Sequence, residues 1–334
     1  MIDVGMAEPQ QFSTPVHLPT KTRLLSNAEA SFRSPASSIT IPASPLMKTL
    51  GVGTGVTVYL YERSPMEGGV TRSPWAIKKV KARTLSLGKN MQRRLKKEAD
   101  ILKTLTHPNI VGYRGFTKSS DGKMCLTMES GEKSLQDLID ERQDNDRGPF
   151  PAKQIYKVAE SLASALDYLH SEKKILHGDL KSGNVIISKD FESVKLCDFG
   201  VALELKDDLS GLKRQGDFYI GSEPWKCSEA VHGGEITDKA DIYAYGLVIW
   251  EMLTLSVPHT DLLDYSGESF DESFAEEMYN AALGTRPPIP NEDELLTNRV
   301  YHQLIELFYV CTNEKPEQRP SAAAVIQALK AVEF

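Results

Sequence analysis

The chain carries the stretch HGDLKSGN at residues 177–184 and the tripeptide DFG at residues 198–200. Two short apolar runs, at residues 185–187 and 194–196, lie between them around a polar turn, which predicts a β-hairpin. A lone His-x-Asp could be a hydrogen-bonded structural cluster. An Asn five residues beyond the Asp, followed by a second Asp directly behind a hairpin, is a far more specific pattern and indicates an active site.

Phosphoryl transfer from ATP accounts for these residue types. The reaction needs a carboxylate that orients the attacking hydroxyl and accepts its proton, oxygen ligands for Mg²⁺, and a cation that offsets developing charge. Asp179 suits the first role and Lys181 the last, so we predict both as catalytic. Asn184 and Asp198 offer the oxygen ligands, so we predict that they bind the metal.

A glycine-rich run lies far upstream of this site. Glycines let a backbone approach phosphate oxygens closely and present its N–H donors. Alone, the run could also be a dinucleotide fingerprint or an ordinary turn. A dinucleotide fold needs a helix directly after the glycines, and here a strand pattern follows, which disfavours that interpretation. We therefore predict phosphate contacts for the whole run, which consists of Gly51, Val52, Gly53, Thr54 and Gly55.

Lys78 lies in an apolar strand pattern, where a lysine is normally a surface residue. Glu98 changes this expectation because it falls within the apolar stripe of a helix predicted over residues 89–105. A carboxylate on a buried helix face needs a partner. We predict that Lys78 pairs with Glu98, which would hold the ammonium against the phosphates, and we count both residues as catalytic.

The apolar periodicity divides the chain into two parts and predicts an α+β, bilobal fold. A small lobe, about residues 47–129, reads as a mostly antiparallel sheet with one main helix. A larger, mostly helical lobe covers about residues 132–330. The predicted strands are 56–61, 75–80, 110–116 and 124–128, and the later predicted helices are one ending near His170 and those over 240–255, 303–310 and 321–332.

Composition excludes several classes of protein. The 334 residues are 40% hydrophobic and 25% charged, as in a globular chain rather than a disordered or fibrous one. A net charge of −7 argues against binding nucleic acid through bulk basicity. The longest apolar run, residues 244–255, is interrupted by Glu251, so we predict no membrane span and no secretory signal. Four scattered cysteines argue against a zinc site or disulfides.

Three segments lie outside the regular pattern. Residues 1–46 are rich in Ser, Thr and Pro, which predicts a disordered tail. Residues 261–278 carry seven carboxylates and no Lys or Arg, which predicts an exposed acidic insertion. Residues 331–334 form a short carboxy-terminal tail.

Together, the glycine-rich run, the Ala-Ile-Lys strand, the helix Glu, HGDLKSGN and DFG occur in the order and spacing of the eukaryotic protein kinases. The chain resembles this family over about residues 47–330. The resemblance implies ATP and Mg²⁺ as cofactors. Because Lys181 lies two residues after Asp179, it also implies a preference for serine and threonine as acceptors. It also implies an adenine site lined by Val58, Ala76, Met128, Glu129 and Gly131.

Further roles follow only from this resemblance. Asp241 corresponds to a buried helix residue that braces the catalytic loop. Glu229 and Arg319 correspond to the ion pair that anchors the end of the activation segment.

The runs IPASP at residues 41–45, EPWK at 223–226 and ALGTRPP at 282–288 resemble a MAP kinase kinase-like, mitotic subgroup of the family with possible dual specificity. That resemblance implies protein substrates such as MAP kinases or histone, a cyclin-dependent kinase acting at Thr14, and a PDZ partner bound through the Phe334 carboxylate. It implies a cytoplasmic or nuclear location, without a membrane or nucleic acid as partner.

The sequence departs from the family pattern at three points. Val56 stands where a third loop glycine is usual, and Cys227 and Ser228 stand where Ala-Pro is usual. Gly178 replaces the Arg that commonly pairs with a phosphorylated activation-segment residue. We therefore expect phosphorylation of the segment between Asp198 and Glu229 to act by another route or to matter less.

Two alternatives to an active protein kinase remain open from the sequence. One is a pseudokinase that serves as a scaffold, which the presence of the complete residue set disfavours. The other is a small-molecule phosphotransferase of similar fold, which the full activation segment ending at Glu229 disfavours.

Overall fold

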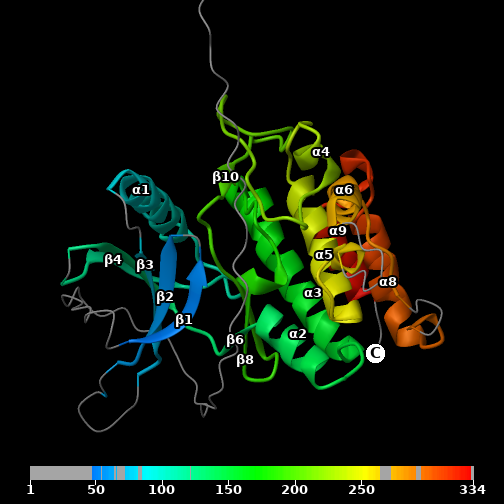
Figure 1. Ribbon diagram of the computed structural model, residues 1–334, viewed down its shortest axis with the longest axis horizontal. Helices are drawn as coiled ribbons and strands as arrows, with labels where there is room; N and C mark the ends of the chain where they lie inside the picture. The colour runs from blue at the N-terminus through cyan, green and yellow to red at the C-terminus, as the bar shows by residue number, and fades with distance from the viewer. Residues whose placement is uncertain are drawn as a thin grey trace, which may run out of the picture.

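The computed structural model describes residues 47–53, 55–63, 65, 72–81, 85–120, 122–263, 272–290 and 295–331. Two lobes lie side by side (Figure 1). The smaller lobe holds a sheet and helix α1, and the larger lobe holds the other helices of these residues. The predicted α+β, bilobal fold is confirmed.

The small lobe is built on a five-stranded sheet with the order β1-β2-β3-β5-β4, in which every neighbouring pair is antiparallel. Helix α1 buries Met91, Leu95 and Leu102 against it. The bounds are β1 Lys48–Gly53, β2 Val56–Tyr61, β3 Trp75–Val80, α1 Leu85–Leu102, β4 Tyr113–Lys118 and β5 Met124–Glu129.

The two faces of this sheet are both covered. Val56 and Val58 of β2 are partly buried and pack against the main core, as their alternation predicts. The opposite face carries a second, small core of Met47, Ile77 and Cys125, with aromatic residues of β2 packed against it. Alternation therefore predicted the strand correctly but did not predict that its second face would be covered as well.

The large lobe is organised around α5, in which every residue from Ala240 to Leu253 is buried. Helices α3 and α8 pack on it. The bounds are β6 Lys133–Ser134, α2 Leu135–Asp144, α3 Ala152–Asp167, β7 Ile175–Leu176, β8 Val185–Ser188, β9 Ser193–Leu196, β10 Leu203–Glu204, α4 Ser228–Val231, α5 Lys239–Thr254, α6 Glu272–Ala282, α8 Arg299–Cys311 and α9 Ala322–Lys330.

Two helix ends differ from the periodicity for local reasons. Helix α1 stops at Leu102 rather than 105 because Thr104 turns back, donating both its N–H and its hydroxyl to the Ile101 carbonyl. Helix α3 ends at Asp167, and the chain continues as a π-helical turn, Tyr168–Lys173, closed by Lys174 at φ 54°. This turn places His170 inside the lobe.

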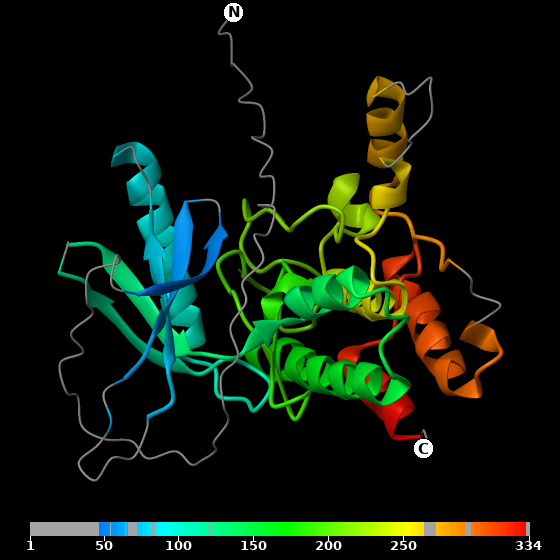
Figure 2. The same cartoon turned by 60° about the horizontal axis from the view of Figure 1, so that its bottom comes forward.

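The acidic segment ends within α6, Glu272–Ala282, which stands out from the large lobe in Figure 2. Phe274 and Met278 on this helix are exposed. The rest of the segment from residue 264 to 271 lies outside the described residues, as do residues 1–46 with Thr14, and residues 332–334 with the Phe334 carboxylate.

The four cysteines, all within the described residues, form no disulfide; Cys125, Cys227 and Cys311 are buried, and Cys197 is half-buried. Across the described ranges, no helix is long and apolar enough to cross a membrane.

Candidate active site

Lys78 joins the two lobes. It lies in β3, paired with β5, and its Nζ donates to Glu98 Oε1 of α1 at 3.0 Å. The same Nζ donates to Asp198 Oδ1 of the large lobe at 2.7 Å. The side chains of Lys78 and Glu98 are almost fully buried, whereas that of Asp198 is 38% exposed. The ion pair between Lys78 and Glu98 is thus present as predicted, and Asp198 shares the same cation.

Burial and charge act against each other in this trio. Burial favours the neutral amine, but the adjacent Asp198 and Glu98 carboxylates outweigh it and raise the pKa of Lys78. Burial raises the pKa of Glu98 to about 7, although Lys78 opposes this rise. For Asp198, burial is outweighed by the Lys78 ammonium, which lowers its pKa to about 2. Lys78 and Asp198 are therefore both charged at neutral pH.

The loop after β7 holds Asp179 by one of its two carboxylate oxygens. Asn184 Nδ2 donates to Asp179 Oδ2 at 3.1 Å and to the Asp179 carbonyl at 2.7 Å. Lys181 Nζ lies 3.6 Å from the same oxygen. The other oxygen, Oδ1, is buried and has no hydrogen-bond partner in the described structure. The two carboxylate oxygens of Asp179 therefore have different surroundings.

Lys181 also contacts the activation segment. Its Nζ donates to Ser222 Oγ at 2.6 Å and lies 5.8 Å from the centre of the Trp225 ring. The sequence did not indicate Ser222 as part of the site. Ser222 lies 41 residues after Lys181 in the chain, so no local sequence pattern indicates this contact.

Asp241 braces the backbone of the catalytic loop. Its two oxygens accept from the N–H groups of His177 at 2.8 Å and Gly178 at 2.9 Å, and from His170 Nε2 at 2.8 Å. Burial opposes its ionisation, but these donors, His170 foremost, lower the pKa of Asp241. His170 was not predicted, and its position at the end of an apolar helix gives no distinguishing signal.

Most of the predicted nucleotide-binding residues lie in β1, β2, β3 and β5, whereas Gly55 lies between β1 and β2 and Gly131 lies between β5 and β6. Gly55 has φ 77°, a conformation that favours glycine, and Val58, Ala76 and Met128 line the core side of the sheet. A Cβ at Gly131 would lie 1.9 Å from Ile186 Cγ2, so only glycine fits there. Gly51 pairs with Val58 next to a bulge in β1, while Thr54 lies outside the described residues.

Glu129, which follows Met128, uses most of its polar atoms within the protein. Its N–H donates to the Gly112 carbonyl at 2.8 Å. Its Oε2 accepts from the Gly112 N–H at 3.1 Å and from Lys195 Nζ at 3.2 Å.

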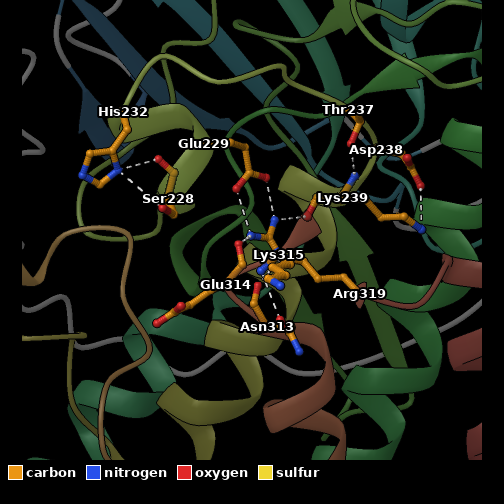
Figure 3. A network of polar contacts seen from close by, with 10 residues as sticks. All are labelled: Ser228, Glu229, His232, Thr237, Asp238, Lys239, Asn313, Glu314, Lys315 and Arg319. Carbon is orange, nitrogen blue, oxygen red and sulfur yellow. Dashed lines mark hydrogen bonds and ion pairs between the residues drawn. The ribbon is translucent and has the colours of Figure 1, made fainter. Parts of the chain in front are cut away.

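The ion pair between Glu229 and Arg319 is bidentate, with distances of 2.6 and 2.9 Å (Figure 3). Arg319 also donates to the carbonyls of Lys239, Asn313 and Glu314 at 2.7–3.2 Å. Its side chain is fully buried. The pair anchors α4, at the end of the activation segment, to the base of the large lobe, as the resemblance implied.

The donor atoms at the site fit Mg²⁺. This ion prefers oxygen ligands and is usually held by one or two carboxylates together with substrate phosphates. Asp198 offers a partly exposed carboxylate. Asn184 uses its amide nitrogen on Asp179, which leaves its oxygen as a ligand. Among the described residues no group of three or more His, Cys, Asp or Glu could hold a metal ion.

Comparison with known proteins bears on the family. The protein kinase domain model matches residues 45–329. The chain is 53% identical over 313 residues to the human lymphokine-activated killer T-cell-originated protein kinase, also called PDZ-binding kinase, covering 92% of this chain and 95% of that protein.

Two proteins of Dictyostelium discoideum are more distant. The chain is 31% identical over 238 residues to the kinase and exchange factor for Rac B, covering 70% of this chain and 20% of that protein. It is 28% identical over 235 residues to the dual specificity protein kinase shkD, covering 70% of this chain and 28% of that protein. The domain match and the extent of the human similarity establish that this chain belongs to the protein kinase family, as an ATP-dependent serine/threonine kinase of the MAP kinase kinase-like kind.

Proposed function

We propose that Asp179 orients the acceptor hydroxyl and accepts its proton, while Lys181 offsets the charge that develops on the transferred phosphoryl group. The observation that carries this proposal is the asymmetry of Asp179, with one oxygen held by Asn184 and the other buried and unpartnered. A carboxylate fixed in this way does not have to reorganise when the hydroxyl arrives, which favours the transition state.

Asn184 and Asp198 would hold Mg²⁺, which would neutralise the charge of the phosphate groups. Lys78 would bind the phosphates, with Glu98 fixing its position. This role is supported by the buried Lys78–Glu98 contact at 3.0 Å and by the partly exposed Asp198 at the other side of the ammonium. Asp198 would turn toward the metal while Glu98 keeps the ammonium in place.

The nucleotide itself would lie against the sheet of the small lobe. We assign phosphate contacts to the backbone of residues 51–55. The adenine would be enclosed by Val58, Ala76 and Met128, with the carbonyl of Glu129 accepting from its amino group. This assignment is supported by Val58, Ala76 and Met128, which lie on the same side of the sheet.

An autophosphorylation assay with Mg·ATP tests these roles. Asp179→Asn should reduce phosphate incorporation on the order of 10²-fold or more, as expected when a proton acceptor is removed. Asp144→Asn, which makes the same change at an exposed position of α2, is the matched control and should keep wild-type activity. Mg·ATP should still raise the melting temperature of the Asp179→Asn protein. Equal incorporation by all three proteins would refute the assignment.

We also propose that the activation segment is held without a phosphate. Gly178 has φ 75°, and a Cβ there would lie 3.8 Å from Cε2 of Tyr219. The ring of Tyr219 thus lies close to the position where an Arg side chain would begin. Tyr219→Phe should keep near-normal activity, whereas Tyr219→Ala should lower it with little change in the KM for ATP. Equal activity of the two variants would exclude this role.

The remaining partners follow from the resemblance. We propose MAP kinases or histone as substrates, a cyclin-dependent kinase acting at Thr14, a mitotic role, and a cytoplasmic or nuclear location. A carboxy-terminal peptide ending in Phe334 would add to the sheet edge of a PDZ domain. Titration of that peptide into PDZ domains, with an amidated peptide as control, tests the last point, and absence of binding would refute it.

A further inference from the structure

A cavity of about 260 Å³ lies in the large lobe, between α2 and the segment that follows α5. Its volume is below the range of about 300–1,000 Å³ typical of small-molecule sites, so it suits a single side chain rather than a cofactor. It is lined by Gln136, Asp140, Gln143, Trp250, Leu255, Ser256, Val257, Thr260, Asp261, Pro288 and Pro290.

The lining combines an apolar wall with negative charge. Trp250, Leu255 and Val257 contribute apolar surface, and the lining contains two carboxylates, Asp140 and Asp261, but no Lys, Arg or His. Asp140 is half-buried and Asp261 is exposed. In the part of the chain that the structure describes, neither forms an ion pair. The cavity therefore presents net negative charge next to apolar surface.

Hydrogen bonds connect this cavity to the catalytic loop. Ser182, three residues after Asp179, donates through Oγ to Gln136 Oε1 at 2.7 Å. Gln136 Nε2 donates in turn to Asp140 Oδ1 at 2.7 Å. Asp140 is thus two hydrogen bonds away from the loop that carries the proposed proton acceptor. A substrate side chain held in the cavity would therefore lie on the same lobe as Asp179.

We propose that this cavity binds an arginine or lysine side chain of the protein substrate and sets a preference for basic residues at a fixed distance from the phosphorylated hydroxyl. This proposal rests on the proposed function, because the side chain in the cavity would belong to a protein that the kinase phosphorylates. The long basic side chains have an apolar stem and a charged end. The stem would lie along Trp250 and Val257, and the charged end would form charge-assisted hydrogen bonds with Asp140 and Asp261.

Peptide kinetics test this inference. The probes are serine-acceptor peptides of one neutral background, in which Arg, Lys or Ala is placed in turn at each position on either side of the serine. For the wild type, Arg or Lys at one particular position should lower KM about tenfold relative to Ala, with kcat nearly unchanged. Asp140→Asn/Asp261→Asn should abolish that gain while leaving KM for the Ala peptide unchanged. A merely structural role would alter both peptides alike.

The matched control is Asp144→Asn/Glu276→Gln, which removes two exposed carboxylates outside the cavity. It should retain the preference, and an equal loss in this control would show bulk electrostatics and overturn the inference. An active wild type without a positional preference would overturn it as well. Fluorescence anisotropy of labelled peptides, without nucleotide, measures the affinity of the Arg and Ala peptides in the absence of turnover. Preserved Arg-dependent binding in a catalytically silent protein would therefore refute the proposed function and support the cavity.

Discussion

Two buried cations, Lys78 and Arg319, are held in different ways. Arg319 is saturated: Glu229 binds it through two oxygens and three backbone carbonyls accept its remaining donors. Lys78 has two carboxylate partners that come from different lobes, and one of them, Asp198, is 38% exposed.

The difference separates a structural contact from one suited to function. All partners of Arg319 lie in the large lobe, and they leave no donor free for a ligand. The Lys78 ammonium can give up its contact with Asp198 and still be bound by Glu98. It can therefore exchange one carboxylate partner for a ligand. Removing the first cation should therefore damage the fold, while removing the second should damage the reaction.

The largest expected effect is on stability. Arg319→Met leaves the buried Glu229 carboxylate without its partner, which should lower the free energy of unfolding by about 3–5 kcal/mol. Urea denaturation measures this change. Arg319→Lys is the conservative control; it keeps the charge but loses the bidentate geometry, so it should lie between the methionine variant and the wild type. If Arg319→Met lowered the free energy of unfolding by less than about 1 kcal/mol, the hydrogen bonds of Arg319 would not be important for stability and the prediction would be wrong.

The second prediction concerns catalysis. Lys78→Met should lower kcat/KM for ATP on the order of 10²-fold or more, because the proposed phosphate contact is lost. Its cost in stability should be smaller than that of Arg319→Met, because Glu98, whose pKa burial already raises to about 7, can take up a proton. Steady-state kinetics and thermal unfolding of the same preparation decide the point. If Lys78→Met destabilised the protein as much as Arg319→Met and left activity intact, Lys78 would have a structural role and this prediction would be wrong.

The third prediction uses Glu251, a buried acid that lacks the ion pair of the other two sites. It accepts from Trp225 Nε1 at 2.9 Å and from the Ser182 N–H at 3.3 Å, and its Oε1 lies 2.5 Å from Ser182 Oγ, whose proton is donated to Gln136. Burial raises its pKa to about 7, and these hydrogen bonds oppose the rise. The folded state then binds the proton more tightly than the unfolded chain, whose pKa is about 4.3. This acid's contribution to stability should fall as pH rises from about 4.3 to about 7.

Glu251→Gln removes this titration, and the amide can still accept from Trp225 Nε1 through its oxygen and donate to Ser182 Oγ through its nitrogen. Its melting temperature relative to wild type should rise across that pH range, corresponding to about 1–3 kcal/mol at the upper end. Glu276→Gln on the exposed face of α6 is the control and should show a constant difference. A constant difference for Glu251→Gln too would refute the assignment.

The smallest effect is expected in the activation segment. Ser210 is exposed, and its N–H donates to Asp208 Oδ1. Because Gly178 offers no cation at the catalytic loop, Ser210→Glu should change the rate of phosphate incorporation by less than about twofold. Ser222→Glu should instead lower activity, since Ser222 Oγ accepts from Lys181. A rise of orders of magnitude in either variant would show that phosphorylation activates this segment.

Much of the fold and part of the site could be predicted from sequence. The Lys78–Glu98 contact was predictable because a carboxylate on an apolar helix face signals a partner. Glu229 and Arg319 lie 90 residues apart, and only resemblance connected them. The π-helical turn after α3 was not predictable, since apolar periodicity continues through it.

Glu251 shows how a signal can be present and still be interpreted only in part. In sequence it interrupts an apolar run and argues against a membrane span. The same interruption marks a buried acid bound to Ser182 and Trp225, residues that are distant in sequence. Its partners depend on how the catalytic loop and the activation segment meet α5, which no local pattern encodes.

The burial of the cysteine thiols has a practical consequence. Three are buried and the fourth is half-buried, and burial raises the pKa of the Cys197, Cys227 and Cys311 thiols. Thiolate is the species that attacks electrophiles, so the native protein should label slowly with a maleimide dye or an aromatic disulfide. Dye incorporation would then report how often each lobe opens, with Cys125 as the probe of the sheet and Cys311 as the probe of the helices.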